Sequence, residues 1–228
     1  MDSKIDWQQI EGSTRKRTHL LASWETGWIK KWTPRIPSFI ETYHLTWSSI
    51  FSSLIVLGSS WLARESSWWL LLTSFGVLVH YITDALDGEV GRQRKTGLIK
   101  WGFYVDHFLD FIFASSVVIG YAFIFPENFV SLLMLLLVIC GYFFNAVLEC
   151  VALGSFRSDG YFGFSGTEMA FGVILFNLLL ILTGGRIPRI SFSIVLAINA
   201  LNLIRRFYIT QRILWEVDMK AKKASRKK

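Results

Sequence analysis

Cysteine is scarce in this chain of 228 residues, and both of its cysteines lie in one apolar segment. Cys140 and Cys150 form no metal-binding or redox motif, so we interpret them as small packing residues. Residues 1–19 are too polar to supply the apolar core of a secretory signal, and no internal repeat or low-complexity tract is evident. These absences argue against cysteine-based chemistry and against a repeat architecture.

Charged residues are also few, because Asp, Glu, Lys and Arg make up 18% of the chain while hydrophobic residues make up 52%. The hydrophobic content exceeds that of ordinary soluble domains, and the apolar residues are gathered in long blocks. A helix needs about 20 mostly apolar residues to span the bilayer core. The sequence therefore predicts an all-α integral membrane protein with six transmembrane helices. The expected spans are roughly 46–64, 67–87, 98–124, 128–152, 165–184 and from about 190 into the basic C-terminal end.

The segment before the first span carries large apolar residues at helical spacing, namely Leu21, Trp24, Trp28 and Trp32. Basic residues surround this row, and such a helix tends to lie in the headgroup plane of the membrane. The alternative is a soluble helix that uses the tryptophans as core. Because no soluble domain is in sight to provide that core, we predict an N-terminal amphipathic interfacial helix, ended by the prolines from Pro34 onward.

The net charge of +7 comes from basic residues that cluster beside the apolar blocks. Nucleic-acid binding is one interpretation of a basic protein, but the lipid-like segments between the clusters argue against it. Lys and Arg beside membrane spans normally mark cytoplasmic loops, and of the 24 basic residues only Arg64, Arg186 and Arg189 fall on the other side. Both termini and the loop between the second and third spans are therefore predicted to be cytoplasmic. The predicted organisation is an interfacial arm (1–45), a six-helix transmembrane domain (46–217) and a basic tail (218–228).

Four aspartates flank that cytoplasmic loop, two before it and two after it. Asp84 and Asp87 stand at the end of the second span, and Asp106 and Asp110 stand near the start of the third. Spacings of three and four place each pair on one helical face. The short loop between the spans predicts an adjacent, antiparallel pair of helices whose cytoplasmic ends bring all four carboxylates together.

Four like charges at a membrane boundary repel one another, and a single aspartate at mid-bilayer costs about 2.5–3.5 kcal/mol. Carboxylate oxygens are hard ligands that suit Mg²⁺, Mn²⁺ or Ca²⁺, and one or two such ions would neutralise the cluster. The alternative is that the aspartates are solvated helix ends or pair with Arg92, Arg94 and Lys100. We interpret four acids at these spacings as a metal site.

The motif around the aspartates resembles the signature of the CDP-alcohol phosphotransferase family, which is D-x-x-D-G-x-x-A-R, a short gap, then G-x-x-x-D-x-x-x-D. Two departures are visible. Gly91 stands where the family has alanine, and the gap between Arg92 and Gly102 is one residue longer than usual. The matching residues here are Asp84-x-x-Asp87-Gly88-x-x-Gly91-Arg92, nine further residues, and Gly102-x-x-x-Asp106-x-x-x-Asp110.

The resemblance implies an enzyme that joins a CDP-linked group to an alcohol and releases CMP. It implies that Asp84, Asp87, Asp106 and Asp110 hold Mg²⁺ or Mn²⁺, with two ions expected, and that Asp110 is also the general base on the attacking hydroxyl. Phosphoryl transfer depends mainly on positioning and on charge stabilisation at phosphate oxygens, which metal ions supply. CDP-diacylglycerol is the favoured donor, with a CDP-amino alcohol as the alternative, and dimerisation is common in the family.

Three further residues of the motif are assigned to the CDP group by the same resemblance. Gly88, at the predicted turn out of the second span, would permit close approach of the nucleotide. Gly102 would leave room for it and let the two helices pack closely. Arg92 would contact phosphate or brace the loop.

The acceptor alcohol is less well specified. Arg157 in a cytoplasmic loop, and Arg205 with Arg206 at the inner end of the sixth span, are candidates for binding an anionic acceptor. Their alternative role is ordinary anchoring of the spans. Glu168 near the start of the fifth span is a candidate for a polar or cationic headgroup, or an acid at a helix start.

Two other classes of protein also place acids in membranes. Intramembrane prenyltransferases hold a diphosphate with aspartates and Mg²⁺, but they generally have more spans and separated motifs. A divalent-cation transporter would carry acids at mid-span on several helices. Because the acids here gather toward one membrane face, we favour the transferase.

Overall fold

The computed structural model describes residues 21–153, 166–186 and 190–225, and these residues form helices and no strands. Within these residues, five helices are long and apolar enough to cross a membrane, and a sixth apolar helix is shorter, at 17 residues. This confirms the prediction of an all-α membrane protein. The helices are α2 (Ala22–Trp32), α3 (Thr42–Leu62), α4 (Leu70–Arg94), α5 (Ile99–Ile124), α6 (Phe129–Leu153), α7 (Gly166–Leu182) and α8 (Ser191–Ser225), with short 3₁₀ turns η1 (Thr33–Arg35), η2 (Ser67–Trp69) and η3 (Pro126–Asn128).

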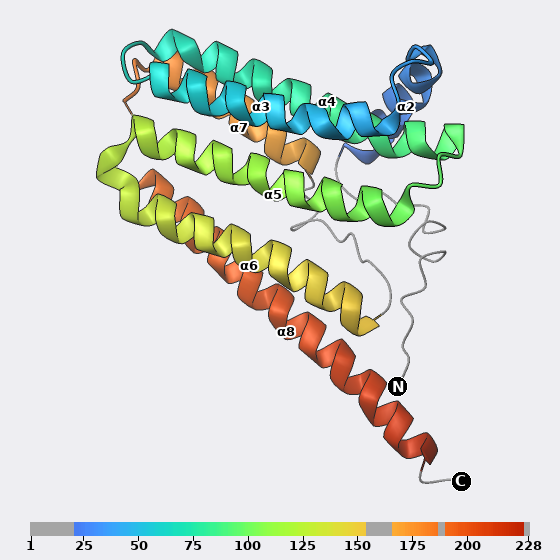
Figure 1. Cartoon of the computed structure of the whole chain (residues 1–228). Helices are drawn as coiled ribbons and strands as arrows, with labels where there is room; N and C mark the ends of the chain where they lie inside the picture. The colour runs from blue at the N-terminus through green and yellow to red at the C-terminus, as the bar shows by residue number, and fades with distance from the viewer. Residues whose placement is uncertain (1–20, 154–165, 187–189, 226–228) are drawn as a thin grey trace.

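Helix α3 packs along both α4 and α5, α7 packs on α4, and α6 joins α5 to α8 (Figure 1). The buried face of α3 consists largely of serine and threonine. Small side chains let helix backbones approach closely in a membrane, where no hydrophobic force between helices drives association. At the α3–α5 contact, a Cβ on Gly120 would lie 2.6 Å from the Oγ of Ser60, so only glycine fits. The central position of α3 thus follows from its small residues.

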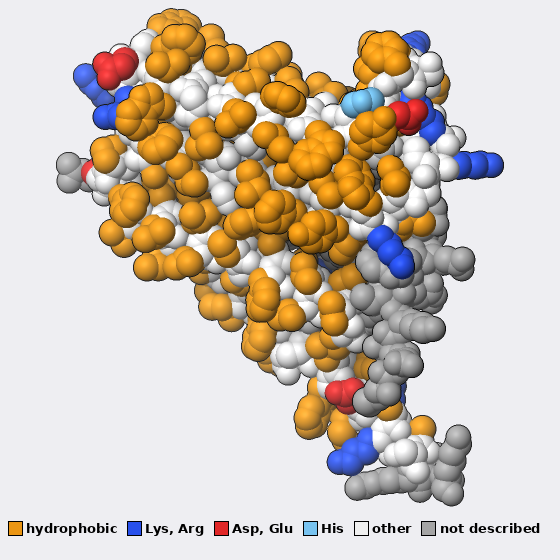
Figure 2. Space-filling model, in the orientation of Figure 1, with side chains coloured by type: hydrophobic (Ala, Val, Ile, Leu, Met, Phe, Trp, Pro, Cys, Tyr) orange, Lys and Arg blue, Asp and Glu red, His pale blue; other side chains and the backbone are white. Residues whose placement is uncertain are grey.

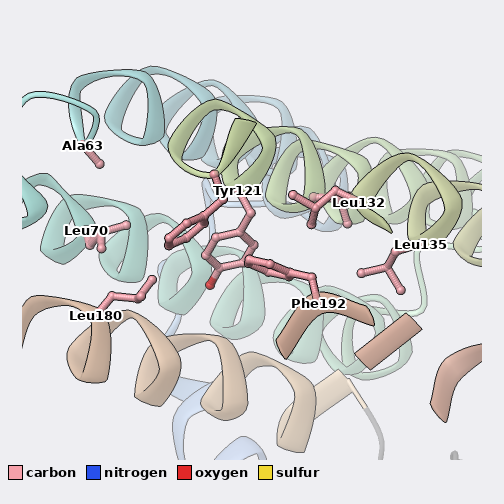
Figure 3. Close-up of a cluster of buried hydrophobic side chains, with 9 residues drawn as sticks. Ala63, Leu70, Tyr121, Leu132, Leu135, Leu180 and Phe192 are labelled. Atoms are coloured by element: carbon pink, nitrogen blue, oxygen red, sulfur yellow. The ribbon is translucent and has the colours of Figure 1, made fainter. Parts of the chain in front are cut away.

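The main hydrophobic core lies at the end of the bundle away from the four aspartates (Figure 3). Tyr121 and Phe192 pack there with the first turns of α4 and α6. A buried polar network crosses the same region: Tyr121 donates to Oδ1 of Asn177 at 2.8 Å, and Asn177 donates to the hydroxyl of Ser74 at 3.0 Å. These contacts fix α4, α5 and α7 relative to one another.

The outer surface is that expected of a protein dissolved in lipid. In Figure 2 hydrophobic side chains cover most of the middle of one face, and charged side chains lie toward its margins. Large apolar residues such as Phe51 on α3 and Leu201 on α8 are more than 60% exposed. In water such an area would be an association surface, whereas in a bilayer it faces hydrocarbon.

Helix α2 turns Glu25 and Ile29 inward, as η1 does Thr33, and leaves Trp24 and Trp32 each 52% exposed. Exposed tryptophans beside exposed lysines agree with the predicted interfacial helix. Trp28 joins the helix to the bundle through its ring contact with Tyr81 of α4.

The prediction that Gly88 forms the turn out of the second helix was wrong. Helix α4 continues from Asp87 through Arg94, and its C-cap is Lys95, which has a left-handed φ of 53°. Gly88 therefore lies inside the helix and does not form the turn, because the left-handed residues come seven and nine positions later, at Lys95 and Gly97. At the other end of the chain, α8 runs without a break to Ser225, so residues 218–225 of the predicted tail are helical.

Candidate metal centre

Three carboxylates meet where the last turns of α4 lie opposite the first turns of α5. One ligand atom from each of Asp84, Asp106 and Asp110 lies within 4.8 Å of the others, and all three side chains are partly buried. The backbones of α4 and α5 do not pack closely along their lengths, since α3 lies against both of them. The carboxylates therefore approach one another across a space that the two helix backbones leave open.

The chemistry of this group fits a divalent cation. It offers three hard oxygen ligands from two helices, and the three negative charges repel one another unless a cation lies between them. Carboxylate and water ligands suit Mg²⁺ and Mn²⁺. Asp84, Asp106 and Asp110 are thus the residues that would hold such an ion.

Arg92 and Arg94, which were alternative partners for the aspartates, form hydrogen bonds elsewhere. Arg92 donates from Nε and Nη2 to Oε2 of Glu89, with an Nη2–Oε2 distance of 2.8 Å. Arg94 donates to backbone carbonyls between Ile36 and Ile40, including those of Ile36 and Pro37 at 3.1 Å each. Its Nη1 also lies 3.6 Å from Oε2 of Glu41. Arg94 therefore ties the segment before α3 to the end of α4.

Asp87 stands apart from the group of three. Its side chain is buried, and its Oδ2 accepts a 2.9 Å hydrogen bond from the hydroxyl of Thr46 on α3. The prediction that four carboxylates converge is confirmed for Asp84, Asp106 and Asp110, whereas Asp87 faces α3. A carboxylate has about four lone-pair positions, so this bond alone does not remove Asp87 from the set of possible ligands.

The two glycines assigned to the CDP group have open space beside them. A Cβ on Gly102 would meet nothing within 4 Å among the described residues, and one on Gly88 would meet only the guanidinium of Arg92, at 3.5 Å. A surface hollow lined by residues 97–101 adjoins Gly102. In the described part of the chain no neighbouring helix comes within 4 Å of a Cβ at Gly102, which does not support the expectation that this glycine lets the two helices pack closely. The space suits the approach of a ligand.

Gly91, by contrast, lies against α3. A Cβ there would lie 3.2 Å from Oγ1 of Thr42, which is tighter than most real contacts of this kind. The departure from alanine in the family motif thus has a local cause. The longer gap between Arg92 and Gly102 contains two residues with a left-handed backbone, Lys95 and Gly97, and the φ of Gly97 is 69°.

His80 is a neighbour of the site that the sequence reasoning missed. Its Nε2 lies 3.6 Å from Oδ1 of Asp110, and its ring stacks on Phe113. The available signal was its position four residues before Asp84, which places both side chains on one face of the helix.

The acceptor candidates are dispersed. Arg206 donates to Oε2 of Glu149 on α6 at 3.0 Å, and Thr210 donates to the same oxygen. Glu168 accepts a 2.9 Å hydrogen bond from the backbone N–H of Leu21, beside α2. Arg205 is exposed on α8, and Arg157 lies outside the described residues. Arg206 and Glu168 thus have contacts within the protein that connect helices.

Comparison with known proteins gives one family. A model of the CDP-alcohol phosphatidyltransferase family matches residues 36–204, a range that begins before α3 and ends within α8. It includes all four aspartates and the glycines between them. The comparison with curated proteins found no match.

Proposed function

Because the chain belongs to the CDP-alcohol phosphatidyltransferase family, we propose that it transfers the phosphatidyl group of CDP-diacylglycerol to an alcohol acceptor and releases CMP. The reaction depends on Mg²⁺ or Mn²⁺, with two ions in the complete site. Family membership supports a membrane-embedded transferase of phospholipid synthesis. The observation that carries the proposal is the convergence of Asp84, Asp106 and Asp110 within 4.8 Å.

The chemistry follows from these carboxylates. In the transfer, the acceptor oxygen forms a bond to the phosphorus that bears the lipid, the bond from that phosphorus to the oxygen of CMP breaks, and the hydroxyl proton passes to Asp110. When bound, the divalent ions would neutralise charge on the diphosphate and on the leaving phosphate. Asp84, Asp87 and Asp106 would hold the ions, and Asp110 would serve as base and ligand. Asp110 serves as the base because of its position beside the hydroxyl.

The CDP group would enter on the side where space is open. Gly88 and Gly102 border that space, and Arg92, whose side chain is 54% exposed, would exchange its bond to Glu89 for one to a phosphate. The distribution of Lys and Arg supports a cytoplasmic location for the site and for both termini. Of the acceptor candidates, Arg205 is exposed on α8, whereas Arg206 is partly buried and donates to Glu149. Arg157 and Glu168 are retained as acceptor candidates.

The test is a CMP-release assay on the purified full-length chain in lipid, with Mg²⁺ or Mn²⁺ and CDP-diacylglycerol. Candidate acceptors such as glycerol 3-phosphate, serine, inositol, inositol phosphate and choline are offered separately. Asp110→Asn should abolish release, whereas Asp218→Asn, an exposed acid far along α8, should not. A CDP-amino alcohol in place of CDP-diacylglycerol decides between the two donors.

The effect of added metal on thermal stability provides a second measurement. Addition of Mn²⁺ should raise the Tm of the wild type, because a ligand that binds the folded state stabilises it. Asp84→Asn and Asp106→Asn should reduce that rise. Metal-independent release, or no CMP from any CDP-alcohol, would overturn the proposal, and diphosphate release from a prenyl diphosphate would favour the prenyltransferase class.

A further inference from the structure

His80 lies beside the carboxylate group. It lies one helical turn before Asp84 on α4, and its Nε2 is 3.6 Å from Oδ1 of Asp110 on α5. Its ring stacks on Phe113, with centroids 3.6 Å apart and ring planes 18° from parallel. Phe113 follows Asp110 by three residues and therefore shares its helical face. The aromatic ring of Phe113 thus fixes the plane of the imidazole, whose Nε2 edge faces the carboxylate.

The surroundings of His80 make histidine energetically unfavourable for a residue that only fills space in the core. Its side chain is 12% exposed, and its Nδ1 has no hydrogen-bond partner among the described residues. A buried polar atom without a partner costs about 1–3 kcal/mol. A phenylalanine or leucine would fill the same place beside Phe113 without that cost. The polar contact that the imidazole does make is with Asp110.

Among the described residues, His80 is not a member of the group of ligand atoms that forms the candidate metal centre. The group whose ligand atoms lie within 4.8 Å of one another consists of Asp84, Asp106 and Asp110, although histidine nitrogens qualify as ligands equally. His80 therefore reaches the site through Asp110.

We propose that His80 is a positioning residue that orients the Asp110 carboxylate for its work as base. This inference rests on the proposed function. The separation of 3.6 Å is slightly longer than a hydrogen bond, and contacts of this kind tighten when substrate is bound. With the proton on Nε2, the imidazole holds Oδ1 of Asp110 and leaves Oδ2 for the acceptor hydroxyl. Misplacement of a reacting group by about 1 Å can cost about 100-fold in rate.

Two substitutions of His80 separate the effect of its N–H donor from the effect of its stacked ring. His80→Gln keeps an N–H donor near the position of Nε2 but removes the stacked ring, and His80→Phe keeps the ring but removes the donor. Both are assayed for kcat and KM with CDP-diacylglycerol, for Mn²⁺ affinity by electron paramagnetic resonance, and for thermal unfolding. We expect His80→Phe to lower kcat by about 10–100-fold with KM and Mn²⁺ affinity near those of the wild type. His80→Gln should recover most of the lost kcat.

The outcomes distinguish this inference from the function on which it rests. A wild type that releases no CMP overturns the proposed function, and this inference with it. An active wild type with full kcat in His80→Phe, or with no recovery in His80→Gln, overturns the positioning role alone. If His80→Phe weakens Mn²⁺ binding as much as Asp106→Asn, His80 is a ligand and the inference is wrong. Should His80→Phe fail to fold, His80→Leu replaces it, and His80→Gln must exceed it in kcat.

Discussion

The hydroxyl of Thr46 on α3 donates a 2.9 Å hydrogen bond to Asp87 on α4. Asp87 is 7% exposed, whereas the other three aspartates of the motif are partly exposed and converge. One sequence motif therefore supplies both a buried carboxylate that connects α4 to α3 and a cluster of carboxylates from α4 and α5. Helix α3, which carries no residue of the motif, takes part in shaping the site.

Thr46→Val should destabilise the protein. Valine has nearly the shape of threonine but no donor, so the buried Asp87 carboxylate loses a bond, at a cost of about 1–3 kcal/mol in free energy of unfolding. Denaturant or thermal unfolding in detergent measures the change. Thr46→Ser, which keeps the hydroxyl, is the matched control and should stay closer to the wild type. Equal stability of the valine and serine variants would contradict the structural role of this bond.

The contact between Gly91 and Thr42 gives a second prediction. Alanine is favoured over glycine inside a helix by about 1 kcal/mol, but a Cβ at position 91 would lie 3.2 Å from Oγ1 of Thr42. We expect Gly91→Ala to stabilise the protein little or not at all, and to stabilise it clearly in a Thr42→Ala background. A double-mutant cycle of unfolding free energies measures the coupling. The same effect of Gly91→Ala in both backgrounds would show that Thr42 does not restrict position 91.

Much of the fold could be predicted because lipid imposes a simple requirement on sequence. Every spanning helix needs a long apolar block, and each such block was visible in the chain. The convergence of Asp84, Asp106 and Asp110 was predictable as well, since helical spacing and a short loop bring those faces together. The helix end near Gly88 was not, because glycine tolerates a helix and Lys95 supplies the left-handed cap.

The contacts that shape the site were harder to predict. The bond between Thr46 and Asp87 joins residues 41 positions apart, and the contact of His80 with Asp110 also joins separate helices. Helical periodicity assigns a residue to a face of its own helix, but it does not say which helix lies opposite. That α3 packs against both α4 and α5 follows from the fit of small residues such as Ser60 against Gly120, and periodicity alone does not predict such a fit.

Gly102→Ala tests the space beside α5. The added Cβ meets no atom of the described residues within 4 Å, so the variant should fold at least as stably as the wild type, with a gain of up to about 1 kcal/mol. If the CDP group uses this space, the KM for CDP-diacylglycerol should rise. Gly172→Ala on α7, where a Cβ is equally unhindered, is the matched control and should leave KM unchanged. An unaltered KM in Gly102→Ala would remove Gly102 from the nucleotide site.

Substitutions in the ion pair between Glu149 and Arg206 test whether Arg206 has a structural role. Glu149 is 3% exposed, and its Oε2 accepts from both Arg206 and Thr210, which joins α6 to α8. Loss of one member of a buried pair leaves the other charge uncompensated and costs about 3–5 kcal/mol, whereas replacing both with apolar residues of similar volume is often neutral. We expect Glu149→Leu to destabilise strongly and Glu149→Leu with Arg206→Met to recover most of the loss, as measured by unfolding in detergent.

The same double variant separates packing from acceptor binding. If Arg206 only joins α6 to α8, the stable double variant should keep the KM for the acceptor, while Arg205→Ala, at an exposed position beside it, should raise that KM. A stable double variant whose acceptor KM rises would instead assign Arg206 to the acceptor. In that case Glu149 would hold the guanidinium in place for an anionic acceptor, because Arg binds phosphate through a planar set of donors whose direction matters.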